Sequence, residues 1–353
     1  MKTTVSGFCS AAIGAALLAV PVIAFADTVN VDFENPPYAL GSINTQNGWT
    51  SLGAAGSGCA VYDHAVAGSL GTAGFGLQSL RISNAVTSGC FGDMTFVKPL
   101  VNAVGETSST AGTYSVGTKQ QHFEMQFNLA SAVPEAQQAG LFMSVSPDRG
   151  DGSRMSYLGF EDVADGINII FYDVQGTSNP ANFVLTDLGV YDRSVPHTIK
   201  LTLDTVDGPS NDVVRVWING TLAHTGTSWE NYYRFDSEAS AEQSPRIVKT
   251  AIFRTGGAAA PATAGAGFLV DNLSTLSGVI LVGPPTDRTQ CTNGGWATFN
   301  NPAFNNQGEC VSFVRGHVNR DRDSEEERGN REGRDGERGH RGERDGDAHS
   351  HQD

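Results

Sequence analysis

Short runs of alternating apolar and polar residues dominate residues 27–276, and apolar positions there do not recur at helical spacing. A period of two places successive side chains on opposite faces of a β-strand. Clusters of Gly, Asn, Asp, Ser and Pro separate the runs, which is typical of an all-β sandwich or jelly roll. The predicted strands are Val29–Phe33, Leu80–Asn84, Asp93–Val97, His122–Leu129, Gly140–Val145, Met155–Glu161, Ile167–Asp173, Thr198–Asp204, Val213–Asn219, Ile247–Arg254 and Gly267–Leu273.

The clearest hairpin joins His197–Asp204 to Asp212–Asn219. Apolar residues alternate with polar ones in both strands, so one face belongs to the core and the other to solvent. The connecting residues 205–211 are turn formers throughout. Asn219-Gly220 predicts a second tight turn directly after the hairpin.

The strand His122–Leu129 has the most informative polar face. Its core face consists of Phe123, Met125, Phe127 and Leu129, and its other face of His122, Glu124, Gln126 and Asn128. In a curved sandwich this polar stripe would line a groove, where His122 and Glu124 could perform acid–base chemistry on a sugar. A second acid is needed, and alternation alone does not place one. The alternative is a solvated face with cross-strand hydrogen bonds.

Two groups of aromatic residues are candidates for stacking on sugar rings. Trp217 projects from the polar face of its strand. Trp229, Tyr232 and Tyr233 cluster with Arg234 in the segment 228–235. The alternative is that this segment folds its own aromatic rings back onto the edge of the sandwich.

Four aspartates are candidate calcium ligands. Asp204, Asp207 and Asp212 surround the hairpin loop, and Asp271 lies in the last predicted strand. Calcium takes 6–8 oxygen ligands, so this set would need backbone or remote oxygens as well. The alternative is that these residues serve only as turn formers. No other cofactor is expected.

The N-terminus has the layout of a secretory signal peptide. Lys2 precedes an apolar run, and Ala24-Phe25-Ala26 forms a small-x-small cleavage site, so residues 1–26 are expected to be removed. Cys59, Cys90, Cys291 and Cys310 then remain, an even number that indicates disulfides. Three pairings are possible, and the local one is Cys59–Cys90 with Cys291–Cys310. We therefore expect a secreted or periplasmic protein.

Composition divides the chain after the sandwich, which we expect to span residues 27–278. A Gly- and Pro-containing linker at 279–289 leads to a compact unit at 290–314 that contains Cys291, Trp296 and Cys310. Residues 315–353 consist mainly of Arg, Asp, Glu, Gly and His, which predicts a disordered charged tail.

The net charge of −15 argues against nucleic acid as a partner. Beyond the signal peptide, no run approaches the roughly 20 apolar residues that a membrane span requires.

Several segments, taken in order, resemble the strands of concanavalin A-like (laminin G-like) jelly rolls of exported bacterial proteins. They are Val31-Asp32-Phe33-Glu34, Gly48-Trp49, Ser79-Leu80-Arg81-Ile82-Ser83, Trp217-Ile218-Asn219-Gly220 and Val270-Asp271-Asn272-Leu273. The resemblance implies the fold over most of residues 27–276. It implies no single function, because lectins, glucanases, lyases and adhesion modules share this fold.

The Cys291–Val314 unit resembles a short module near the C-termini of exported bacterial proteins, with the pattern Cys-x-x-Gly-Gly-Trp followed by Asn-Gln-Gly-x-Cys-Val-Ser-Phe-Val. A disulfide loop closing around Trp296 and Phe304 is expected, and the module implies no activity.

These features favour an exported jelly-roll protein that binds carbohydrate or another surface polymer without catalysis. The glucanase pattern Glu-x-Asp-x-x-Glu and the alginate-lyase patterns Arg-x-Glu-x-Arg and Gln-Ile-His are absent from the sequence. One alternative is a polysaccharide hydrolase or lyase that uses the strand around Glu124. Another is a structural or surface-adhesion protein without a small-ligand site.

Overall fold

The computed structural model describes residues 27–52, 63–87, 93–106, 117–239, 246–256, 258–279, 284–299 and 302–316. The chain forms two compact units, Met1–Val279 and Ile280–Asp353. The predicted signal peptide, the Cys59–Cys90 pair and the tail beyond residue 316 lie outside the described residues.

The first unit contains two large antiparallel sheets. Sheet A has the order β15-β14-β13-β8-β18-β5-β4-β2, and β1 also pairs with β18. Its strands are β1 (Asp27–Val31), β2 (Gly41–Ser42), β4 (Asp63–Gly68), β5 (Gln78–Ser83), β8 (His122–Ser131), β13 (His197–Asp204), β14 (Val213–Ile218), β15 (Thr221–Gly226) and β18 (Phe268–Gly278).

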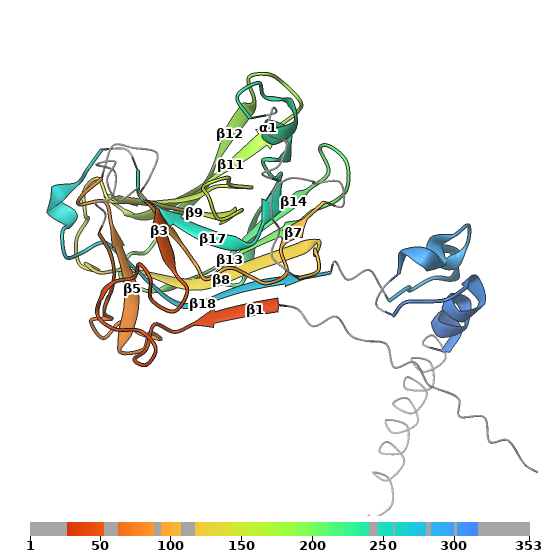
Figure 1. The fold of residues 1–353 in the computed structure, drawn as a ribbon, viewed down its shortest axis with the longest axis horizontal. Helices are drawn as coiled ribbons and strands as arrows, with labels where there is room; N and C mark the ends of the chain where they lie inside the picture. Colours follow the sequence, from red (N-terminus) through yellow and green to blue (C-terminus); the bar gives the residue numbers. More distant parts are fainter. Residues whose placement is uncertain are drawn as a thin grey trace, which may run out of the picture. The chain divides into compact units, whose positions relative to one another are not determined.

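Sheet B has the order β12-β11-β10-β9-β17-β6-β3. Its strands are β3 (Thr50–Leu52), β6 (Met94–Phe96), β9 (Phe142–Asp148), β10 (Leu158–Val163), β11 (Gly166–Gln175), β12 (Asn182–Tyr191) and β17 (Thr250–Arg254). A third, small sheet pairs β7 (Val104–Gly105) with β16 (Ile247–Val248). In Figure 1, β8, β18 and β1 lie on one side of the sandwich, and β11, β12 and α1 (Glu230–Phe235) extend away from sheet A on the other.

The core lies between the sheets and follows the predicted alternation. On β8, Phe123, Met125, Phe127 and Leu129 are fully buried, while the residues between them face outward. Phe127 meets Phe160 of β10 and Phe253 of β17 edge to face. Edge-to-face packing of rings from opposite sheets stabilises the sandwich beyond the burial of area alone. The predicted all-β jelly-roll sandwich is therefore confirmed.

The predicted hairpin is present as β13 and β14, with Ile199 opposite Ile218 and Asp204 opposite Val213. Asn219 and Gly220 join β14 to β15, and both have positive φ. A two-residue turn with positive φ at both positions matches the twist of a hairpin, and glycine adopts this conformation at little steric cost. The second tight turn is therefore confirmed.

Several elements differ from the prediction. The strand β12 was not expected, because as an edge strand it keeps many side chains exposed and lacks a clean apolar alternation. The short helix α1 occupies part of the predicted aromatic segment. Six residues are too few to reveal a helical period in a sequence. The predicted run Ile247–Arg254 divides into β16 and β17, which pair in different sheets.

The described part of the second unit consists of η2 (Arg288–Cys291), η3 (Gly295–Thr298) and a helix over residues 307–316. The predicted disulfide Cys291–Cys310 is present, and both cysteines are buried with Val314. The partly buried rings of Trp296 and Phe304 pack against them. Across the described residues, no helix combines the length and apolar character needed to cross a bilayer.

Candidate functional site

The outer face of sheet A carries the predicted polar stripe, but its side chains are largely paired with one another. Glu124 lies 3.5 Å from the ammonium group of Lys200. The same ammonium group lies 4.5 Å from the centre of the Trp217 ring, so Lys200 occupies one face of that ring. Gln126, opposite Lys200 on the neighbouring strand, is exposed.

At the end of the stripe, His122 and Arg215 share one carboxylate. One carboxylate oxygen of Asp204 lies 2.6 Å from His122 Nδ1, and the other lies 2.6 Å from a guanidinium nitrogen of Arg215. Burial alone would raise the pKa of Asp204, but the hydrogen bonds and charges of His122 and Arg215 outweigh it and hold the pKa below its usual value. Asp204 is therefore an ionised partner that orients His122.

Asp204 also supplies a carboxylate near Glu124. Glu124 stands opposite Thr202 and His122 stands opposite Asp204. Asp204 is thus a diagonal neighbour of Glu124, and such neighbours lie about 7–8 Å apart in an antiparallel sheet. The lowered pKa of Asp204 does not suit the proton donor that a glycosidase requires.

The four predicted calcium ligands do not come together. Asp204 lies at the His122 end of β8, whereas Asp271 pairs with Asn128 further along the same strand. Asp271 accepts hydrogen bonds from the N–H groups of Gly76 and Asn272. Asp212 belongs to a separate buried cluster. A calcium site built from these four residues therefore has no geometric support.

The predicted aromatic cluster does form, around helix α1. Trp229 is 8% exposed and donates its indole N–H to the carbonyl oxygen of Tyr172 at 2.9 Å. Tyr233 is buried and donates its hydroxyl to the carbonyl oxygen of Arg154. Tyr232 is only partly buried. Trp229 and Tyr233 therefore anchor α1 to sheet B, and Tyr232 keeps more of its ring accessible.

The structure adds residues to this cluster that the sequence reading missed. The rings of Tyr157 and Trp229 are nearly parallel, with centres 6.2 Å apart. The Arg154 guanidinium lies over both, at 5.5 Å and 5.2 Å from their centres. Tyr172 meets Tyr157 edge-on at 5.3 Å, and Phe183 meets Trp229 edge-on at 4.9 Å. Phe183 is 40% exposed, so the row of rings reaches the surface.

A polar floor lies next to these rings on β9. Ser144, Ser146 and Asp148 share the face of β9 opposite to the core residues Met143 and Val145. Ser144 stands opposite Arg254 of β17 and donates to its carbonyl oxygen. Asp148 forms a β-bridge with Arg154. Together with the rings, these residues define what we call the arginine–aromatic face, which lies on the outer side of sheet B.

Burial dominates the electrostatics of the arginine–aromatic face. It raises the pKa of Asp148 to about 6, against the opposing hydrogen bonds from the N–H groups of residues 150–152. Burial, followed by the charge of Arg154, lowers the pKa of Arg254. Burial raises the pKa of the Tyr157 hydroxyl, and a hydrogen bond with Ser144 and the charges of both arginines counteract this shift. The face thus holds two guanidiniums in a weakly screening environment.

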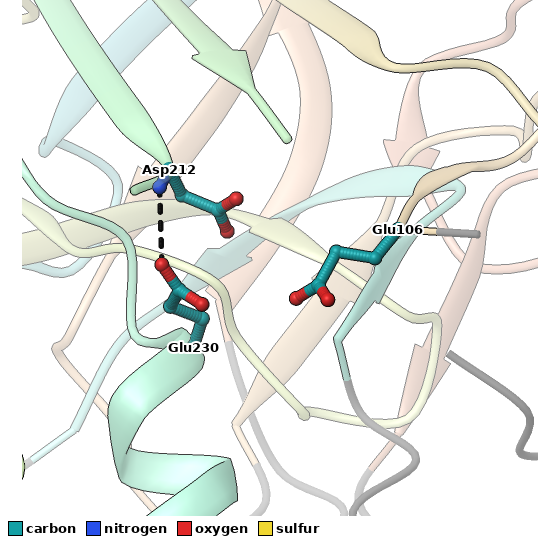
Figure 2. A group of neighbouring side chains, drawn as sticks. All are labelled: Glu106, Asp212 and Glu230. Atoms are coloured by element: carbon teal, nitrogen blue, oxygen red, sulfur yellow. Dashed lines mark hydrogen bonds between the residues drawn. The ribbon is translucent and has the colours of Figure 1, made fainter. Parts of the chain in front are cut away.

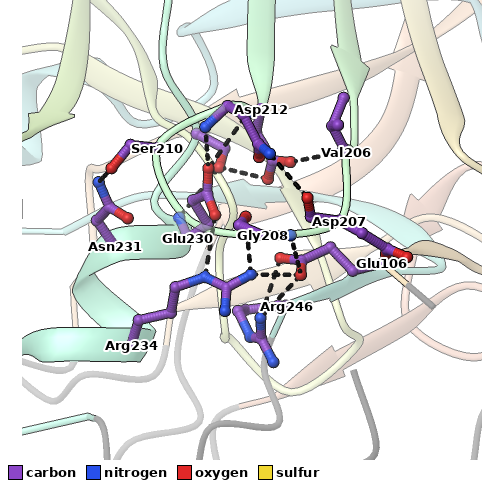
Figure 3. Close-up of polar contacts among 12 residues, drawn as sticks. Glu106, Val206, Asp207, Gly208, Ser210, Asp212, Glu230, Asn231, Arg234 and Arg246 are labelled. Carbon is purple, nitrogen blue, oxygen red and sulfur yellow. Dashed lines mark hydrogen bonds and ion pairs between the residues drawn. The ribbon is translucent and has the colours of Figure 1, made fainter. Parts of the chain in front are cut away.

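A third group, the carboxylate–arginine network, fastens α1 to the hairpin loop. Oxygens of Glu106, Asp212 and Glu230 lie within 4.8 Å of one another, and all three residues are buried (Figure 2). Arg234 bridges Glu106 and Glu230, and Arg246 lies 3.0 Å from Glu106 (Figure 3). Carboxylate oxygens are calcium ligands, but here guanidiniums already pair with Glu106 and Glu230.

Asp212 is the member of this network that bonds to neutral donors. It accepts hydrogen bonds from the N–H of Val206 and the hydroxyl of Ser228. Burial, followed by the charge of Glu230, raises its pKa to about 7. When Asp212 carries a proton, the two remaining carboxylate charges of the network equal the two guanidinium charges. The network therefore stabilises the fold and is not a metal site.

Sequence patterns offered little signal for the arginine–aromatic face. Ser144 and Tyr157 lie within predicted strands, and Ser146 directly follows the predicted strand Gly140–Val145. Arg154 and Arg254 stand just outside or at the end of such strands, and 100 residues separate them. The pairing of β17 with β9 places Arg254 opposite Ser144, and a β-bridge joins Arg154 to Asp148 of β9.

Comparison with family models gives no match, and comparison with curated proteins gives none either. Solved structures resemble parts of the chain. The match to a sialidase has 11% identity and a TM-score of 0.37. It covers 75% of this chain and 19% of the sialidase chain. The match to an alginate lyase from Pseudomonas aeruginosa has 10% identity and a TM-score of 0.31. It covers 56% of this chain and 79% of the lyase chain. The match to a CBM66 carbohydrate-binding module from Bacillus subtilis has 8% identity and a TM-score of 0.32. It covers 67% of this chain and 100% of the module. These values are too low to transfer a ligand or an activity.

Proposed function

We propose that this chain is an exported protein that binds carbohydrate through the arginine–aromatic face, without catalysis. The observation that carries the proposal is the position of Arg154 over the Tyr157 and Trp229 rings, in a row that continues to exposed Phe183. Sugar rings pack their CH-bearing faces on aromatic side chains, and a few fixed polar groups orient the hydroxyls. The disulfide Cys291–Cys310 supports export, because such bridges persist in oxidising compartments.

Binding is proposed in preference to catalysis because the described residues of this face offer no well-placed acid. Asp148 is the carboxylate nearest to the rings along β9, and it is 0% exposed. One of its oxygens is occupied by the N–H groups of residues 150–152. A carboxylate held in this way does not reach a glycosidic oxygen.

The test is a glycan-binding measurement on the full chain, with Phe183→Ala as the variant. Phe183 lies on an edge strand and is partly exposed, so its loss should leave the fold intact. Loss of one stacking ring should weaken binding about 3- to 10-fold. The matched control is Trp217→Ala on sheet A, which should bind as the wild type does. Failure of the wild type to bind any glycan, or loss of binding only in the control, would contradict the proposal.

The outer face of sheet A favours a second candidate function, cleavage of a polysaccharide by elimination. The supporting observation is the His122–Asp204 pair, in which an ionised carboxylate holds Nδ1 and leaves Nε2 as the nitrogen that can accept a proton. A lyase needs such a base together with cations that neutralise the substrate, and Lys200 and Arg215 lie nearby.

Product analysis separates this candidate from binding alone. An unsaturated product that forms with the wild type and disappears with His122→Gln would establish elimination. New reducing ends without unsaturation, abolished by Glu124→Gln, would instead establish hydrolysis. An unaltered polysaccharide excludes both reactions for that substrate.

A further inference from the structure

We infer that the carbohydrate bound at the arginine–aromatic face is an uncharged, extended polysaccharide, and that it continues from the rings along an apolar strip on β12. This inference rests on the proposed function and names the substrate class for the same site. The β12 strip, as we call this surface, consists of side chains from two neighbouring strands. They are Phe183, Leu185 and Val190 of β12 with Ile170 and Tyr172 of β11.

Strand pairing places the β12 strip on the outer side of sheet B. Phe171 of β11 is fully buried in the core, so its neighbours Ile170 and Tyr172 face outward. Leu185 stands opposite Tyr172. Residues directly opposite each other in an antiparallel pair share a face, so Leu185 also faces outward. Phe183, two residues before Leu185, shares its face.

The strip extends along β12 beyond a β-bulge. Val190 stands opposite Asn168, which lies two residues before Ile170 and therefore faces outward with it. Phe183, Leu185 and Val190 are 40%, 49% and 49% exposed. A strand rises about 3.3 Å per residue, so these three side chains cover roughly 20 Å along β12. Several sugar units in a row can contact a strip of this length.

The strip begins at the rings of α1. The ring of Phe183 meets that of Trp229 with centres 4.9 Å apart and that of Tyr232 with centres 5.4 Å apart. Tyr232 is only partly buried. A sugar that stacks on these rings can therefore continue onto β12 without leaving apolar surface.

The strip also joins the rings across β10. Gly159 of β10 stands opposite Ile170. A Cβ at Gly159 would lie 2.8 Å from the Ile170 side chain and 3.2 Å from the Tyr157 ring, so both side chains lie over this glycine. Tyr172 meets Tyr157 edge-on. The arginine–aromatic face and the β12 strip thus form one continuous surface.

The charges along the strip favour an uncharged partner. Residues 157–191, which contain β10, β11 and β12, include no lysine or arginine. Two exposed acids share the outer face, because Asp187 stands opposite Ile170 and Glu161 stands opposite Asn168. These acids and the net charge of −15 repel an anionic polymer. Neutral sugar hydroxyls can instead donate hydrogen bonds to the two carboxylates.

The size of the strip favours a sugar chain over a second copy of the protein. Its three most exposed side chains offer at most a few hundred Å² of apolar surface. A stable protein interface buries about 800 Å² on each partner. Two copies that each carry a charge of −15 also repel each other. The CH-bearing faces of a sugar need far less area to pack on apolar side chains.

The shape of the strip favours an extended chain. Its side chains follow one strand, so a polymer that contacts all of them must run nearly straight. β-1,4-linked sugar chains are extended, whereas α-1,4-linked glucans coil. The substrate class is therefore a neutral β-1,4-linked polysaccharide.

The experiment measures binding of the full chain to cellobiose and cellohexaose, to chitobiose and chitohexaose, and to maltohexaose. We expect at least one of cellohexaose and chitohexaose to bind about 10-fold more tightly than its disaccharide and than maltohexaose. Leu185→Ser should weaken binding of that hexasaccharide about 3- to 10-fold. Leu222→Ser is the matched control, because Leu222 is 50% exposed on β15, the edge strand of sheet A. It should bind as the wild type does.

Two further measurements keep the outcome decisive if Leu185→Ser does not fold. Val190→Thr keeps the shape and the β-branch of the side chain, so the strand should form, and binding of the hexasaccharide should weaken about 2- to 3-fold. For the wild type, salt at about 1 M should not weaken the binding, because no ionic attraction contributes to it.

Each failure identifies the part that is wrong. Equal affinity for the hexasaccharide and its disaccharide, or equal effects of Leu185→Ser and Leu222→Ser, overturns the strip and leaves carbohydrate binding at the rings standing. Equally tight binding of maltohexaose overturns the extended class, and binding that salt abolishes overturns the uncharged class. A wild-type dimer that Leu185→Ser converts to a monomer assigns the strip to a second copy. Absence of binding to these sugars and to every other glycan overturns the proposed function as well.

Discussion

Asp204 and Asp212 show how the surroundings of one residue type decide its charge. Both flank the same hairpin loop, at the end of β13 and the start of β14. Asp204 pairs with His122 and Arg215, which hold its pKa below the usual value. Asp212 is more deeply buried near Glu230 and Glu106, and its pKa is raised to about 7. Nothing in the local sequence distinguishes them.

Asp212 should make the protein less stable as the pH rises. In the unfolded chain this group loses its proton near pH 3.8, whereas in the folded protein it keeps the proton until about pH 7. Between these values the folded state binds more protons, so its stability falls with increasing pH. We expect Asp212→Asn to remove this loss, and the unfolding free energy of the variant relative to wild type should rise by about 3 kcal/mol from pH 4 to pH 8.

Urea unfolding at several pH values measures this difference. Asp63→Asn is the matched control. Against the opposing effect of burial, hydrogen bonds and charge from Arg81 and a hydrogen bond from Ser83 hold the pKa of Asp63 below its usual value. Its contribution to stability is therefore present above its unfolded pKa and is lost only as the pH falls through the folded one. The difference between this control and wild type should therefore stay constant from pH 5 to pH 8. A constant difference for Asp212→Asn as well would contradict the prediction.

At the scale of elements, a six-residue helix decides where the aromatic side chains lie. An isolated helix of this length is not stable in water, so α1 depends on tertiary contacts. Its contacts are the buried Trp229 and Tyr233 on one side and the carboxylate–arginine network on the other. The accessible rings of the arginine–aromatic face are thus positioned by the ion pairs of Arg234.

Arg234→Gln should release α1. The variant removes the bridge between Glu106 and Glu230, whose side chains are 1% and 2% exposed. Breaking a buried ion pair from one side typically costs about 3–5 kcal/mol. Arg215→Gln is the control, since Arg215 has a 36% exposed side chain and its ion pair should contribute less than about 1 kcal/mol. Urea unfolding measures both, and a red shift of tryptophan emission in Arg234→Gln alone would report the loosened helix. Equal stability losses would contradict the role of the network.

At the scale of the molecule, the sandwich and the disulfide unit are separate compact bodies. The second unit has a small core around Cys291, Cys310 and Val314. A core of this size cannot by itself offset the conformational entropy of ordering the chain. The disulfide therefore carries much of the stability of this unit.

The double variant Cys291→Ser/Cys310→Ser should unfold the second unit and leave the sandwich intact. A bridge across a sequence separation of 19 contributes about 3 kcal/mol in the chain-entropy model. Hydrogen exchange should show loss of protection in residues 302–316 and unchanged protection in β8 and β13. A fall in the protection of β8 would show that the sandwich depends on the second unit.

The sequence alone determined the fold class, the faces of individual strands and the disulfide Cys291–Cys310. Alternation in β8 and the Asn219-Gly220 turn are local properties, because a period of two and a positive φ depend only on neighbouring residues. The sequence also identified the aromatic residues around Trp229 and the polar stripe of His122, Glu124 and Gln126, whose roles as ligand contacts stay predictions.

Only the tertiary structure decided which of these side chains meet. It placed Lys200 over Trp217, brought Arg154 and Arg254 to one face across 100 residues of sequence, and separated Asp271 from Asp204. It also buried Asp212 among carboxylates, which changes the charge of that residue near neutral pH. Such contacts depend on strand pairing between distant segments and on exclusion of water, and neither property is encoded in the spacing of residues along a single strand.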